Sequence, residues 1–200
     1  METNQELKDR HQYSIKGIFP KYIIRKFLCS CSILVSIVIT FVLSFLILYF
    51  RIEDTFVLLE DIIEITLDLL PNLLGFCIGG YALIIGIGNI EALKKMSSPM
   101  ENRENLSFFQ ILSSIFASSL VLQCITLLLS FIIKILLKLK LPAYSNQIAI
   151  IVNSLTIIIV LFFSVLSVVL LYYTVINLFN YGQSMHFLIR LEKREQNEQQ

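Results

Sequence analysis

The sequence predicts an all-α, polytopic membrane protein with four transmembrane helices and an additional amphipathic helix between the first and second spans. Of its 200 residues, 56% are hydrophobic and the mean hydropathy is +0.77. A soluble domain of this length uses less apolar sequence. Four apolar runs each pass the ~20 residues that span a bilayer. None alternates polar and apolar residues as the strands of a membrane barrel do.

The first span is predicted at about residues 28–50, after a basic N-terminal segment of residues 1–27. The apolar run is far longer than the h-region of a signal peptide, and no small-residue cleavage site accompanies it. We therefore expect a retained membrane anchor. Residues 28–180 are expected to form one four-helix transmembrane domain, followed by a charged tail at residues 181–200.

Residues 51–68 connect the first two spans and carry six acids. At 100° per residue these acids fall on an arc of roughly 120°, which predicts an amphipathic helix with one acidic face that feeds into the second span at Pro71. Such a face is either solvated at the headgroup boundary, an acidic ring at a pore mouth or a surface for a basic partner. Ion pairs with Lys134, Lys138 and Lys140 would instead make it structural. This outer acidic stripe comprises Glu53, Asp54, Glu60, Asp61, Glu64 and Asp68.

The second span, at about residues 69–90, holds five of the seven glycines and no charged residue after position 70. In bilayers, small residues mark the surface where one helix meets another closely. Heptad spacing therefore predicts a face for helix packing or oligomer contact. The sequence leaves open whether that contact lies within or between subunits. The face comprises Asn72, Gly75, Gly79, Ala82, Gly86 and Asn89.

The third and fourth spans are predicted at about residues 108–133 and 148–179. Each carries uncharged polar residues along one side, which favours helix packing, with the wall of an aqueous path as the alternative. The tail either prolongs the fourth helix or begins at a break at Gly182. The polar residues are Ser119, Gln123, Thr126 and Ser130 in the third span and Asn153, Thr156, Ser167, Thr174 and Asn177 in the fourth.

Basic residues in the connecting segments predict the orientation. Twelve Lys or Arg residues lie in the N-terminal segment, the second connection and the tail, against four in the other two connections. By the positive-inside rule both termini are cytoplasmic, and we expect a multi-pass protein of a bacterial inner membrane. The inner connection and the tail would present a surface to a soluble protein partner, at Lys94, Lys95, Arg103, Arg190, Lys193 and Arg194.

Groups that membrane enzymes and coupled transporters need are missing from the sequence. No Asp, Glu, Lys, Arg or His lies mid-span, where a coupling or catalytic group would be required. His11 and His186 fall outside the apolar runs, and the spacing of the four cysteines fits no zinc or redox motif. We therefore expect no enzymatic activity, no cofactor and no metal, and the net charge of +1 predicts no direct nucleic-acid binding.

The segment LLGFCIGGYALIIGIGN, residues 73–89, lies within a plan of short basic N-terminus, four spans, small connections and charged tail. This combination resembles the membrane-subunit family of the Kiwa anti-phage defence system. The resemblance implies a homo-oligomer that senses phage attack at the membrane and holds a soluble cytoplasmic partner; no functional residue is matched. We expect a non-enzymatic oligomeric membrane sensor or scaffold. The alternative is a small oligomeric ion-conducting pore with an acidic outer vestibule.

Overall fold

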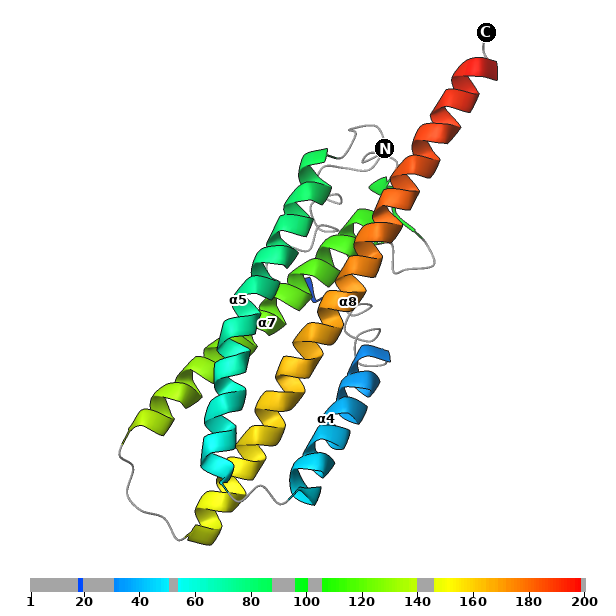
Figure 1. The fold of residues 1–200 in the computed structure, drawn as a ribbon. Helices are drawn as coiled ribbons and strands as arrows, with labels where there is room; N and C mark the ends of the chain where they lie inside the picture. Colours follow the sequence, from blue (N-terminus) through cyan, green and yellow to red (C-terminus); the bar gives the residue numbers. More distant parts are fainter. Residues whose placement is uncertain are drawn as a thin grey trace. The chain divides into compact units, whose positions relative to one another are not determined.

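The computed structural model describes residues 18–19, 31–50, 54–87, 96–100, 106–139 and 146–198. This part of the chain is helical, with no β-strand beyond an isolated bridge between Pro99 and Ser107. The all-α class is confirmed. The helices, shown in Figure 1, are α4 (Cys31–Tyr49), α5 (Thr55–Ile87), α7 (Phe108–Lys138) and α8 (Asn146–Glu198).

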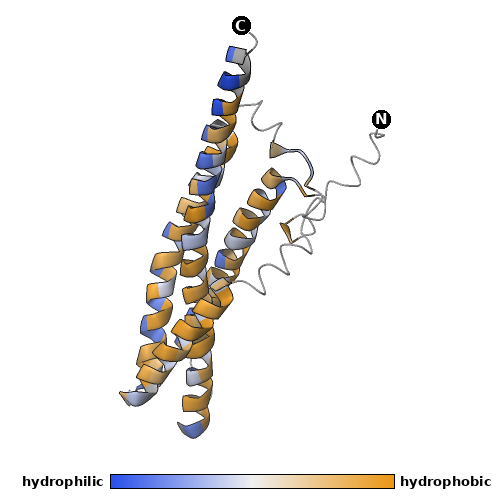
Figure 2. Cartoon of the chain, turned by 90° about the vertical axis from the view of Figure 1, so that its right-hand side faces the viewer, coloured by the Kyte–Doolittle hydropathy of each residue, from blue (hydrophilic) through white to orange (hydrophobic). Residues whose placement is uncertain are grey.

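Three of these helices are long and apolar enough to cross a membrane. The apolar stretches are Thr55–Gly86, Phe108–Lys138 and Gln147–Leu191, and α4 adds a shorter one at Cys31–Ile47. Figure 2 shows hydrophobic residues along most of α8 and hydrophilic ones at its C-terminal end. The chain is therefore an all-helical membrane protein.

Helix α7 begins at a capping box. The side chain of Ser107 accepts a hydrogen bond from the backbone N–H of Gln110 at 3.1 Å, and the side chain of Gln110 accepts one from the backbone N–H of Ser107 at 2.9 Å. This reciprocal pair satisfies N–H groups that have no partner within the helix. It explains why the helix starts at Phe108.

Helix α5 joins the acidic segment and the second span into one helix of 33 residues, where the sequence predicted a separate amphipathic helix. Pro71 lies inside it and lacks the N–H that would bond to the carbonyl of Leu67. The helix continues through Pro71 although one backbone bond is lost. Leu70 before it is fully buried, and Pro71 and Asn72 are exposed.

Helix α8 runs without interruption past Gly182 to Glu198. The tail therefore prolongs the fourth helix, and the alternative of a break at Gly182 is not observed. An exposed glycine in a helix interior lowers helix stability by about 1 kcal/mol relative to alanine. This loss is too small to interrupt a helix of 53 residues.

The contacts divide the chain into two compact units, which we call unit 1 and unit 2. Unit 1 draws on residues 1–29, 77–118 and 173–200, and unit 2 on residues 30–76 and 119–172. Helices α5, α7 and α8 each contribute a segment to both units. The core of unit 1 comprises Ile84, Met96, Leu112, Phe116 and Tyr181, and that of unit 2 comprises Leu59, Ile63, Ile157 and Val160.

Candidate interaction face on helix α5

One row of α5 is buried within the chain. Its members follow one another at intervals of three, four or seven residues, which fit the heptad spacing of one helix face. Within unit 2, Thr66 of this row shares a hydrogen bond of 3.0 Å with the hydroxyl of Ser164 on α8. The row therefore sets which side of α5 faces the chain's own core. It comprises Leu59, Ile63, Thr66, Leu70, Cys77, Gly80 and Ile84.

The small-residue face predicted from the sequence lies on the opposite side of α5. A Cβ built at Gly75, Gly79 or Gly86 would meet no atom within 4 Å. Asn72 and Ala82 are also exposed, and Asn89 lies outside the described residues. Within the described part of the chain, no side chain or backbone therefore packs against the glycines of this face.

Gly80 differs from its neighbour Gly79. A Cβ at Gly80 would lie 3.6 Å from Cε1 of Phe116 and 3.8 Å from Cδ2 of Leu178. Gly80 thus belongs to the contact between α5, α7 and α8 inside unit 1. The sequence prediction placed Gly79 on the packing face and did not include Gly80. Heptad spacing alone does not show which face of a helix packs against the core of its own chain.

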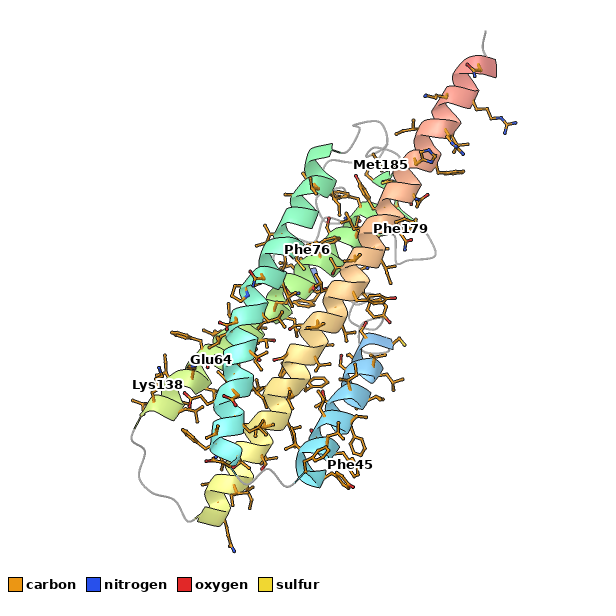
Figure 3. The ribbon with its side chains drawn as sticks, in the orientation of Figure 1. Phe45, Glu64, Phe76, Lys138, Phe179 and Met185 are labelled. Atoms are coloured by element: carbon orange, nitrogen blue, oxygen red, sulfur yellow. The ribbon has the colours of Figure 1, made fainter. Side chains whose placement is uncertain are left out.

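Bulky side chains border the open strip. Phe76 and Leu83 lie along one edge and are 50% and 55% exposed, while Ile78 and Ile85 lie along the other at 56% and 51%. Figure 3 labels Phe76 on this helix. Between the two ridges, from Gly75 to Gly86, no side chain extends beyond a Cβ. A strip of small residues between two ridges is a surface into which a second helix packs.

The acidic stripe continues the same face toward the start of α5. Asp54, Asp61 and Asp68 fall in the same seven-residue repeat as Gly75 and Ala82. Asp61 and Asp68 are exposed, as are the small residues. The two candidate sites are therefore one continuous face of one helix. The seven-residue repeat is visible in the sequence. The sequence analysis treated the acids and the glycines separately, because it expected the second span to begin near Pro71.

Of the five stripe acids that the structure describes, Asp54 and Glu64 have partners for their side chains. Asp54 is the N-cap of α5, because its Oδ1 accepts hydrogen bonds from the backbone N–H groups of Phe56 and Val57 at 3.1 and 3.2 Å. Glu64 forms an ion pair of 3.0 Å with Lys134 of α7, and Figure 3 labels Glu64 beside α7. The internal ion pairing considered from the sequence is thus present at Glu64. Glu53 and Lys140 lie outside the described residues, Lys138 and Asp61 are exposed, and Glu60 is half-buried.

The polar stripe of α7 faces the interior of unit 2. Ser119, Gln123, Thr126 and Ser130 are all at most 2% exposed, and Nε2 of Gln123 donates a hydrogen bond of 3.4 Å to the hydroxyl of Ser119. On α8, Ser167 and Thr174 are buried, whereas Asn153, Thr156 and Asn177 are half-buried. The stripe of α7 is therefore buried within the chain, whereas the stripe of α8 is buried only at Ser167 and Thr174.

A further small polar stripe was missed by the sequence analysis. On α4, Ser32, Ser36 and Thr40 are buried at intervals of four residues, and Ser44 continues the row. The hydroxyl of Ser36 donates to the carbonyl of Ser32 at 2.8 Å. The signal that could have found it is a small residue at every fourth position.

The predicted cytoplasmic surface is described only in part. Arg190, Lys193 and Arg194 lie on the exposed end of α8, whereas Lys94, Lys95 and Arg103 lie outside the described residues. Among the residues that were placed, no three His, Cys, Asp or Glu side chains form a group suited to a metal ion.

Comparisons with known proteins found no matching family model, no similar curated protein and no similar solved structure. The function is therefore inferred from the physical properties of the chain itself.

Proposed function

We propose that this chain is a non-enzymatic, homo-oligomeric membrane sensor or scaffold that couples an event at the cell envelope to a soluble cytoplasmic partner. In this proposal all four helices span a bacterial inner membrane with both termini in the cytoplasm, and the role belongs to anti-phage defence. The observation that carries the proposal is the open glycine strip of α5, which has no neighbour within 4 Å at Gly75, Gly79 or Gly86.

The strip supports self-association for a physical reason. Lipid tails are as apolar as leucine, so helix association in a membrane depends on close van der Waals packing, hydrogen bonds and lipid entropy. A glycine surface offers few atoms to a lipid chain, but it lets a second backbone approach closely. The exposed positions that border the strip carry Phe, Leu or Ile, so the small strip is a local exception.

A path for coupling is supported by the continuity of α5. This helix extends from its acidic start at Thr55 to Ile87. Within unit 1, the hydroxyl of Tyr181 on α8 donates a hydrogen bond of 3.1 Å to the carbonyl of Ile84. Helix α8 then continues to the basic residues at its end. A change in how α5 packs against another copy would reach the tail of α8 through this contact.

Purification from native membranes tests the proposal. The full-length protein, extracted in mild detergent after brief crosslinking, should appear as a multimer together with a soluble protein. Replacing Lys193 and Arg194 by Glu should release that protein and leave the multimer intact, because the tail is remote from the strip in sequence. Recovery of a monomer without a soluble companion would contradict the proposal.

An ion pore is the second candidate, and the exposure of Asp61 and Asp68 in the repeat of Gly75 favours it. Acids at this place in an oligomer would concentrate cations at a pore mouth. The purified protein should then conduct cations across a planar bilayer, and Glu60→Gln with Asp61→Asn should lower that conductance. The absence of an ionic current at all voltages and with all ions would exclude the pore and favour the scaffold.

A further inference from the structure

Unit 1 contains a groove beside α8 that the proposed function does not use. Its volume is about 440 Å³, and its lining is Met96, Phe108, Gln183, Ser184, Phe187 and Leu188. Phe108 and Leu188 also pack against the buried core of unit 1. Phe187, by contrast, is 60% exposed. One wall of the groove is thus fixed by the core, and another is open to the surroundings.

The lining combines apolar and polar side chains. Met96, Phe108, Phe187 and Leu188 supply the apolar wall. The hydroxyl of Ser184 donates a hydrogen bond of 2.9 Å to the carbonyl of Asn180 on the same helix. Gln183 is exposed, and its amide is a donor and an acceptor at the rim.

A basic residue extends this rim. Positions 183, 187 and 190 are four and three residues apart, so Arg190 lies one turn beyond Phe187 on the same side of α8. The Arg190 side chain is exposed. A guanidinium group binds phosphate oxygens in a bidentate manner. Along this side of α8 the Gln183 amide comes first, then the apolar ring of Phe187 and then the Arg190 cation. An apolar wall followed by a cation matches a ligand with an apolar body and an anionic head.

The groove also lies where the apolar part of α8 ends. The apolar stretch of this helix runs to Leu191, and the residues beyond are mainly charged. Figure 2 shows this end of α8 as hydrophilic.

We propose that this groove binds one anionic phospholipid. An acyl chain lies against Met96, Phe108 and Phe187, and the phosphate lies near Arg190. The occupant is a lipid because the groove has an apolar wall with a cation one turn beyond it, and anionic lipids attract basic side chains. The inference does not depend on oligomer formation, so the two proposals can fail separately.

The absence of tryptophan from the sequence gives a direct test. Phe187→Trp places a single indole in the groove of the full-length protein, and Phe179→Trp places one on the same helix outside the lining, at a position that is 64% exposed. Figure 3 labels Phe179. Each variant is reconstituted in phosphatidylcholine vesicles that contain a minor fraction of phosphatidylglycerol, with brominated chains on one lipid or the other. Brominated phosphatidylglycerol should quench the indole at 187 more strongly than brominated phosphatidylcholine does, and the two should quench equally at 179.

A charge variant then tests the headgroup contact. Arg190→Gln in the Phe187→Trp background should lower the preference for phosphatidylglycerol about fivefold, since one basic residue near a membrane surface contributes ~1 kcal/mol and 1.4 kcal/mol is tenfold. Lys138→Gln, an exposed cation in unit 2, should leave the preference unchanged. Equal quenching by the two lipids at 187, or a preference that survives Arg190→Gln, would overturn the proposal.

Discussion

The hydroxyl of Tyr181 on α8 donates a hydrogen bond of 3.1 Å to the carbonyl of Ile84 on α5, and both residues are buried. The bond attaches α5 to α8 within unit 1.

Removal of this hydroxyl should weaken unit 1. Tyr181→Phe leaves the buried carbonyl of Ile84 without its donor, which should lower the free energy of unfolding by about 1 kcal/mol. Unfolding by SDS in mixed micelles measures the change. Tyr49→Phe is the matched control, because Tyr49 is 71% exposed. Equal losses in the two variants would refute a role for the bond.

The capping box at the start of α7 predicts a second effect. Ser107→Ala removes the acceptor for the backbone N–H of Gln110, and the loss of such a cap costs about 1 kcal/mol. Hydrogen exchange of the first turn of α7 should become faster. Ser184→Ala should have little effect on its own helix, since its hydroxyl bonds to a carbonyl of that helix. Unchanged exchange near Phe108 would contradict the capping role.

The ion pair between Glu64 and Lys134 should be weak and sensitive to salt. The Glu64 side chain is 62% exposed and that of Lys134 is 20% exposed. A double-mutant cycle with Glu64→Ala and Lys134→Ala should therefore give a coupling of about 0.2–1 kcal/mol that decreases at high ionic strength. A larger coupling that salt does not change would mean that the pair is buried away from water.

Gly80 should be sensitive to a large side chain for reasons of folding. Leucine at this position would collide with Phe116 and Leu178, which already lie 3.6 and 3.8 Å from the Cβ position. Such overpacking costs about 1–3 kcal/mol. Gly80→Leu should therefore lower the stability measured in SDS, whereas Gly79→Leu should not. Equal stability of the two variants would show that α7 and α8 move aside.

The sequence predicted the helices well because each apolar run is long and free of mid-span charge. The sequence did not predict which side of α5 faces the core of the chain. Leu59, Ile63 and Leu70 repeat at heptad spacing on one side, and Gly75, Gly79 and Gly86 do so on the other. In water the more apolar side of a helix would be the buried one. In a membrane both sides are apolar enough to face lipid. The positions of the neighbouring helices therefore decide which side is buried.

Local signals explain the remaining differences. Pro71 is typical of a helix boundary, yet α5 continues through it, with Leu70 before it buried and Asn72 after it exposed. The serine row of α4 is visible in the sequence at Ser32 and Ser36. Single hydroxyl residues in an apolar run can also face lipid, so their spacing did not predict that they are buried. Their burial depends on contacts that spacing alone does not specify.

The most direct test of the account is the mass of the Gly79→Leu protein, measured by native mass spectrometry from detergent micelles. The wild-type chain should be a multimer, and Gly79→Leu should be a monomer or a smaller multimer, because a bulky side chain separates backbones that would otherwise touch. Gly182→Leu makes the same substitution at an open glycine of α8 and should leave the mass unchanged. A Gly79→Leu multimer of wild-type mass would contradict the proposal that the small-residue face of α5 joins copies of this chain.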